Sequence, residues 1–156
     1  MIRVENLVKR YASQEAVKGI SLEIPDGQLV GLLGPNGAGK SSTLRMLTGM
    51  MLPTSGRAQV EGFDVATQPV EVKRVVGYVP ESGAVFEALT AWEYLTFVAA
   101  LYHIPEPQAA ERIEQFSQFF ELDSATLRQK PMAAYSKGMR QKVVITSALL
   151  HNPKVV

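Results

Sequence analysis

The sequence has no cysteine among its 156 residues, which excludes disulfide bonds and thiolate metal sites. It has two histidines, His103 and His151, and no partner spacing around them suggests a metal site. It also lacks an excess of charge, because 16 Lys and Arg residues face 15 Asp and Glu residues. A general attraction to nucleic acid or to anionic lipid is therefore not expected, and no nucleic-acid partner is predicted.

Long hydrophobic runs are missing as well. The N-terminal segment has no charged-then-apolar signal arrangement. The most apolar segment, residues 89–104, contains Glu93 and is shorter than the roughly 20 residues that a membrane span needs. It is therefore predicted to be a helix of a soluble domain. The remaining composition, 46% hydrophobic and 20% charged, is ordinary for a globular chain, and the length fits one domain.

The hydrophobic pattern predicts strands in the first half and helices in the second. Residues 2–11 alternate between apolar and polar, which predicts a half-buried strand, and residues 16–24 predict a strand antiparallel to it. Residues 29–33 are almost uniformly apolar, which is typical of a parallel strand covered on both faces. The other expected elements are a helix at 40–50, short strands at 57–65 and 74–81, a weak helix at 69–73, and helices at 90–103, 107–121 and 137–150.

A phosphate-binding loop follows the apolar segment. Residues 34–41, GPNGAGKS, match G-x-x-x-x-G-K-[ST] in full, between a predicted strand and a predicted helix. Glycines let the backbone approach a phosphate closely. The phosphate oxygens then accept hydrogen bonds from amides of the loop and of the helix N-terminus. Lys40 is expected at the β- and γ-phosphates, Ser41 on Mg²⁺ and Ser42 at the α-phosphate. The expected nucleotide-binding residues here are Gly34, Pro35, Asn36, Gly37, Ala38, Gly39, Lys40, Ser41 and Ser42.

Several ordered segments together resemble the ATP-binding-cassette (ABC) family of ATPases. They are Tyr11, GPNGAGKSS, PTSG, GYVPE, LTAWEYL and YSKGMRQK, and the resemblance runs from about residue 2 to the end. It implies an α/β P-loop NTPase core with an N-terminal antiparallel β-subdomain and an inserted α-helical subdomain. The expected division is a β-rich core at 1–89, a helical subdomain at 90–135, and a signature helix with the start of the Walker B strand at 136–156.

The resemblance also implies roles for residues outside the loop. Tyr11 stands where the family has an aromatic residue that stacks on adenine. YSKGM stands where the family has its signature, Leu-Ser-Gly-Gly-Gln, which faces the γ-phosphate held by a second subunit. Ser136 fits a helix N-cap, and Ser136, Lys137 and Gly138 are therefore expected to contact that phosphate. Tyr135, Lys137 and Met139 depart from the family's signature, and the variant resembles that of exporter-type systems.

Glu81 stands where family members usually have glutamine. The resemblance implies a catalytic role together with Lys40, and a contact with Mg²⁺ together with Ser41. A carboxylate is a favourable Mg²⁺ ligand, although a solvated loop acid is the alternative. The segment after it, residues 82–103, corresponds to the surface that docks a transmembrane subunit. Most of its aromatic residues are expected in the core; they are Phe86, Trp92, Tyr94 and Phe97.

The resemblance implies an ABC-type ATPase that binds ATP and Mg²⁺ and energises transport, with export favoured. Its expected partners are a second ATP-binding subunit, in a head-to-tail dimer, and a transmembrane permease subunit. Its expected location is cytoplasmic, at the periphery of the cytoplasmic face of the membrane. One alternative is a soluble ABC ATPase that acts on ribosomes or DNA. Another is an unrelated P-loop switch or kinase, for which the YSKGM helix would have no use.

The last residues, 153–156, stand where the family's Walker B strand begins. The resemblance implies that the Asp-Glu pair ending that strand, and a later histidine, are missing from this chain. We therefore expect an incomplete domain that binds ATP weakly without turning it over. The missing strand should lie beside residues 29–33, so an exposed edge, with self-association or marginal stability, is expected there.

Overall fold

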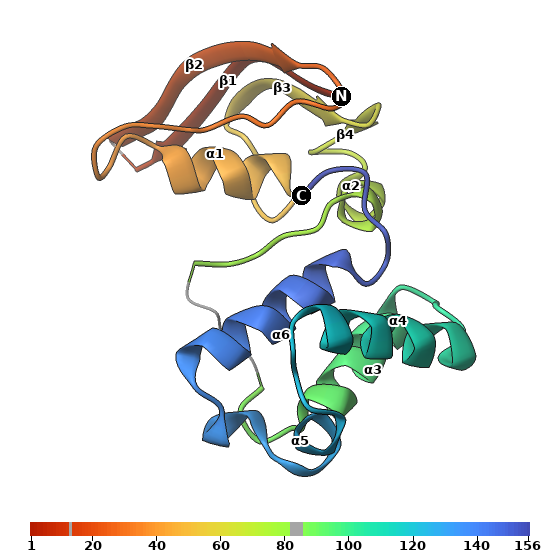
Figure 1. Cartoon of the computed structure of the whole chain (residues 1–156). Coiled ribbons are helices and arrows are strands. Elements are labelled where there is room, and N and C mark those ends of the chain that lie inside the picture. The colour runs from red at the N-terminus through yellow and green to blue at the C-terminus, as the bar shows by residue number, and fades with distance from the viewer. Residues whose placement is uncertain (13, 82–85) are drawn as a thin grey trace. The chain divides into compact units, whose positions relative to one another are not determined.

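The structure, a computed structural model, describes residues 1–12, 14–81 and 86–156. It divides into two compact units, Met1–Val76 and Gly77–Val156 (Figure 1). The first unit holds a sheet with two helices, and the second is helical. Among the described residues, no helix has the length and the apolar character needed to cross a membrane.

The first unit contains a four-stranded antiparallel sheet in the order β2-β1-β3-β4 (Figure 1). Its two longest strands, β1 (Ile2–Tyr11) and β2 (Gln14–Ile24), pair antiparallel as predicted. The single strand predicted at 57–65 is wrong, because β3 (Ser55–Val60) and β4 (Phe63–Asp64) form a hairpin there. The two residues between them both have positive φ, which is the backbone of a tight type I′ turn.

A bulge changes which face of β1 is buried. Strict alternation would place Ile2, Val4 and Val8 on one face, but the buried residues are Val4 and Leu7. The strand register shifts between these two residues, and Asn6 between them has a φ of 47°. Asparagine tolerates this conformation better than most residues, and the extra residue turns Leu7 into the core.

Helix α1 (Lys40–Leu47) packs on the sheet against β2 and β3 (Figure 1). Its buried residues are Thr43 and Met46, whereas Leu44 is exposed. The helix predicted near residue 69 is confirmed as α2 (Pro69–Val75).

The predicted strands at 29–33 and 74–81 are wrong. In the described part of the chain, residues 28–35 join no strand, and Leu29 and Leu33 are 103% and 93% exposed. A strand needs a neighbour for its backbone hydrogen bonds, and the single described sheet offers none to this segment. The segment is exposed, but it does not form the strand whose edge was expected to be unpaired. Residues 74 and 75 belong to α2, and no strand follows them in the part of the chain that the structure describes.

In its described residues, 77–81 and 86–156, the second unit contains four helices and a short 3₁₀ turn. The predicted helices are confirmed as α3 (Ala91–Leu101), α4 (Glu106–Phe119) and α6 (Lys137–Leu149), and α5 (Ser124–Gln129) was not predicted. Helix α3 contacts the other three. A capping box fixes its start, because Thr90 accepts from the Glu93 amide and Glu93 accepts from the Thr90 amide. The shared core is formed by Ala91, Leu95, Ala99, Ala109, Ile113, Leu122, Leu127, Met132, Tyr135, Val143 and Leu150.

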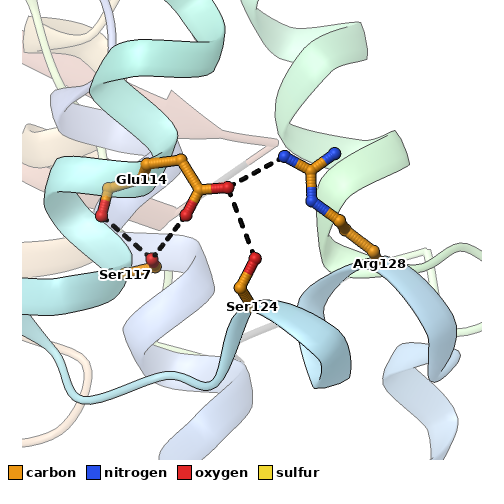
Figure 2. Close-up of polar contacts among 4 residues, drawn as sticks. All are labelled: Glu114, Ser117, Ser124 and Arg128. Atoms are coloured by element: carbon orange, nitrogen blue, oxygen red, sulfur yellow. Dashed lines mark hydrogen bonds and ion pairs between the residues drawn. The ribbon is translucent and has the colours of Figure 1, made fainter.

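Polar contacts attach the short helix α5 to its neighbours (Figure 2). The Glu114 carboxylate of α4 accepts from Arg128 Nη2 at 2.8 Å and from Ser124 Oγ at 3.4 Å. Ser117 Oγ donates to the Glu114 carbonyl oxygen at 2.9 Å. The Arg128 guanidinium also lies 3.3 Å from the ring centroid of Trp92 on α3. One arginine therefore ties α5 to both α3 and α4.

Replacing Arg128 by alanine is expected to lower the free energy of unfolding of the second unit by about 1 kcal/mol, since it removes a half-exposed ion pair and a cation–π contact. Urea unfolding followed by Trp92 fluorescence measures the effect. Lys130→Ala, an exposed cation two residues away, serves as the control. Equal midpoints for the two variants would show that the Arg128 contacts contribute nothing.

Candidate functional site

The phosphate loop ends at the first residue of α1. Gly39 is the N-cap and has a φ of 87°, in the left-handed region that favours glycine. A Cβ atom at this position would lie 2.3 Å from the carbonyl oxygen of Ala16 on β2. The loop therefore lies so close to β2 that only glycine fits.

The first turn of α1 presents unpaired backbone donors. The first helical bond is from the Thr43 amide to the Gly39 carbonyl, at 2.8 Å, so the amides of Lys40, Ser41 and Ser42 have no acceptor within the helix. In the described structure no side chain caps this turn, and the turn contains no acidic residue. Free amides and the positive end of the helix dipole together fit an anion.

Lys40 lies over its own loop. Its ammonium donates to the carbonyl oxygens of Gly34 and Pro35, at 2.7 Å and 2.9 Å. The one cation of residues 34–41 is thus held against the backbone of the loop. The donor set of amides, ammonium and hydroxyls fits a triphosphate, whose oxygens are all acceptors.

Tyr11, the last residue of β1, lies beside the first turn of α1. Its hydroxyl oxygen is 3.2 Å from Ser42 Oγ and donates to Met51 Sδ at 2.9 Å. The side chain remains 43% exposed. The structure therefore brings together two residues that the sequence assigned separately to nucleotide binding. It also places Lys9, which sequence reasoning missed, over the Tyr11 ring. The sequence does contain a signal for this contact, because Lys9 and Tyr11 are two residues apart on one strand and so lie on the same face.

Ser136 is the N-cap of α6, as predicted. Its Oγ accepts a hydrogen bond from the Met139 amide at 3.2 Å. Lys137 and Gly138 follow in the first turn, both exposed, and the turn contains no acidic residue. This helix start therefore presents a cation and free amides to solvent, an arrangement that suits an anion.

Tyr135, a departure from the family's signature, is the residue just before the cap and is anchored in the core. It is 3% exposed, and its hydroxyl donates to the Thr126 carbonyl of α5 at 3.0 Å. Burial raises the pKa of the Tyr135 hydroxyl, and the negative charge of Asp123 raises it further. The group therefore stays protonated, and remains a donor, throughout the neutral range. The tyrosine is a core residue that fixes the start of α6 to α5.

Replacing Ser136 by alanine should cost about 1 kcal/mol of stability, because the Met139 amide loses its acceptor. Ser136→Asn keeps a capping oxygen and is the matched control. Thermal unfolding by circular dichroism compares the two. A melting temperature for Ser136→Ala equal to that of Ser136→Asn would mean that the cap contributes nothing.

Glu81 is an exposed turn residue of the second unit, whereas Ser41 belongs to the first unit. A joint Mg²⁺ site formed by the two stays a prediction. Among the described residues, no group of three or more acidic or histidine side chains could hold a metal ion. The exposed Ser41 hydroxyl nevertheless fits Mg²⁺, which proteins often bind through one or two ligands together with phosphate oxygens.

The segment expected to dock a transmembrane subunit is described only in part, since residues 82–85 lie outside the described residues. The expectation that its aromatic residues are mostly in the core is wrong for two of them. Phe86 is 61% exposed and Phe97 is 50% exposed, while Trp92 and Tyr94 are partly buried against the core. The Phe86 ring lies 6.1 Å from that of Tyr94 and 6.5 Å from that of Phe97, centroid to centroid.

Comparisons with known proteins agree with this arrangement. A protein-family model described as ABC transporter matches residues 17–156. YxlF of Bacillus subtilis (strain 168), an uncharacterized ABC transporter ATP-binding protein, is 38% identical over 154 residues, which are 99% of this chain and 50% of YxlF. A solved ATP-binding subunit of an ABC transporter is 32% identical, with a TM-score of 0.87 over 98% of this chain and 63% of that one.

A dimeric ATP-binding cassette, solved with ADP and Pi in a post-hydrolysis state, shares the fold. Its TM-score is 0.85, with 23% identity over 98% of this chain and 71% of that one. The chain spans about half the length of the curated relative YxlF. The predicted fold class is thereby confirmed, with the antiparallel β-subdomain and the helical block as expected. Since the family match extends from residue 17 to residue 156, the chain belongs to the ABC transporter family.

Proposed function

We propose that the protein containing this chain is the ATP-binding subunit of an ABC transporter. It would couple the binding and hydrolysis of ATP to the export of a substrate. The observation that carries the proposal is the start of α1, where Gly39 in the left-handed conformation leaves three amides free and Lys40 lies over the loop. A nucleoside triphosphate is the ligand whose chemistry uses all of these donors.

Each residue of the loop has a proposed task. The amides of residues 37–42 bind phosphate oxygens, Lys40 balances the charge on the β- and γ-phosphates, and Ser42 donates to the α-phosphate. Ser41 is the proposed Mg²⁺ ligand of this unit, with Glu81 as a second one. When bound, Mg²⁺ would neutralise charge between the β- and γ-phosphates. The exposed ring of Tyr11 would stack on adenine.

We further propose two protein partners. A second ATP-binding subunit would meet this one head to tail, so that Ser136, Lys137 and Gly138 face the γ-phosphate held by the partner. The dimeric cassette among the similar structures supports the pairing of two such subunits. A transmembrane permease subunit would bind this subunit at the cytoplasmic face of the membrane, and the exposed rings of Phe86 and Phe97 on this chain would offer it apolar contact.

Hydrolysis is proposed for the whole protein. Within residues 1–156 the sequence assigns no Walker B acid pair and no switch histidine, so we propose that this chain alone binds ATP without turnover. A phosphate-release assay on the purified chain checks this point. Steady turnover that disappears in a Lys40→Met variant would contradict it.

Replacing Tyr11 by alanine is expected to weaken the binding of MgATP about tenfold, because the base loses its stacking partner. Tyr11→Trp keeps an aromatic face and should bind nearly as tightly as the wild type. Isothermal titration measures both. An unchanged affinity in Tyr11→Ala would remove Tyr11 from the site, whereas unchanged binding in Lys40→Met would contradict the phosphate loop itself.

A further inference from the structure

We propose that Lys9 is a positioning residue for the nucleotide base: its side chain holds the ring of Tyr11 at the angle and depth at which adenine can stack on it. This inference rests on the proposed ATP site. It adds a residue that lies outside the phosphate loop and that neither the loop motif nor the family resemblance assigns.

The first support is the position of the Lys9 ammonium. Lys9 and Tyr11 are two residues apart on β1, so their side chains leave the same face of the strand. The Lys9 nitrogen lies 5.4 Å from the centroid of the Tyr11 ring. This distance is within the range of cation–π attraction, in which the charge faces the electron-rich side of the ring.

The second support is that the ammonium is itself fixed. Lys9 is only partly exposed, and its nitrogen donates to the carbonyl oxygen of Leu52 at 2.8 Å. The segment around Leu52 is attached to β1 in turn. The Thr54 amide donates to the Val8 carbonyl at 2.8 Å, and the Arg10 amide donates to Thr54 Oγ1 at 3.0 Å. Lys9 is thus held between two parts of the backbone, unlike a freely moving surface lysine.

The third support is the way the other end of Tyr11 is held. Its hydroxyl contacts Ser42 and Met51, and one face of its ring contacts Lys9. Both the hydroxyl and that face of the ring are therefore in contact with protein. The side chain still keeps 43% of its surface exposed, and that surface is available to a flat ligand. A ring already fixed in place loses little conformational freedom when a base stacks on it, which favours binding.

Two physical roles for Lys9 make different predictions. If Lys9 acts through Tyr11, only ligands that carry a base should depend on it. If its charge instead attracts the phosphates, a ligand without a base should depend on it equally. Inorganic triphosphate in the presence of Mg²⁺ has the same phosphate chain as ATP and no base, so it separates the two roles.

The experiment compares Lys9→Met, Lys9→Arg and the wild type by isothermal titration with MgATP and with magnesium triphosphate. Lys9→Met should bind MgATP about threefold more weakly, a loss typical of ordering one side chain on binding. Its affinity for triphosphate should stay unchanged. Lys9→Arg, which also places a cation over the ring, should restore most of the ATP affinity. Lys18→Met, at an exposed position on β2, is the control for loss of charge.

A double-mutant cycle completes the test. In a Tyr11→Ala background, Lys9→Met should cause no further loss of ATP affinity, because the two residues act as one unit. Melting curves of each variant verify folding, and Lys9→Arg keeps the test valid if Lys9→Met unfolds. Equal losses for ATP and triphosphate, additive losses in the cycle, or no loss in Lys9→Met would each overturn the inference while leaving the ATP site in place. Failure of the wild-type chain to bind MgATP would overturn the proposed function and the inference with it.

Discussion

Replacing Lys40 by methionine is expected to weaken the binding of MgATP about a hundredfold, which makes it one of the two largest effects that the structure predicts. Lys40 is the one cation within residues 34–41, and its ammonium already lies within hydrogen-bond distance of two loop carbonyls. Methionine keeps the length of the side chain and removes the charge. Isothermal titration of the wild type and the variant with MgATP measures the change.

The control for Lys40→Met is Lys18→Met, which removes the same charge from an exposed position on β2. It should leave the affinity for MgATP unchanged. If both variants lose affinity equally, the effect comes from the net charge of the chain and not from the loop.

Replacing Gly39 by alanine is expected to destabilise the first unit by about 3 kcal/mol and to abolish ATP binding. The new Cβ atom would lie 2.3 Å from the Ala16 carbonyl oxygen and 3.0 Å from Val17 Cγ2. Because the nearest atom belongs to the backbone of β2, it cannot move aside as a side chain can. The start of α1 would have to leave the sheet, and the three free amides would move with it. Thermal unfolding and MgATP titration measure the two consequences.

Gly37 provides a matched control for the Gly39 experiment. Its φ of 84° is nearly the same, but a Cβ atom there would meet nothing within 4 Å. Gly37→Ala therefore has only the cost of the left-handed conformation, about 1–2 kcal/mol. A Gly39→Ala protein as stable as Gly37→Ala would show that the close approach to β2 does not constrain the loop.

Local sequence signals predicted the features that depend on a few neighbouring residues. The N-cap at Ser136 and the helices after Lys40 and Thr90 are examples, since each start depends on backbone donors within one turn. The same holds for the loop itself, whose glycine spacing determines the backbone shape.

Features that depend on distant residues could not be predicted in this way. The almost uniformly apolar segment at 29–33 has the composition of a buried strand, but a strand forms only where another strand pairs with it. The burial of Leu7 depends on a bulge at Asn6, which alternation does not reveal. A lysine such as Lys9 is expected at the surface, and only its position over Tyr11 suggests a role.

Amide chemical shifts of residues 37–42, measured by NMR before and after addition of MgATP, test the central claim most directly. If the free amides at the start of α1 bind phosphate oxygens, these signals should shift strongly, and their hydrogen exchange should slow. Signals from the far end of β2, near Ile24, should stay in place. The account is contradicted if MgATP binds while the signals of residues 37–42 remain unchanged.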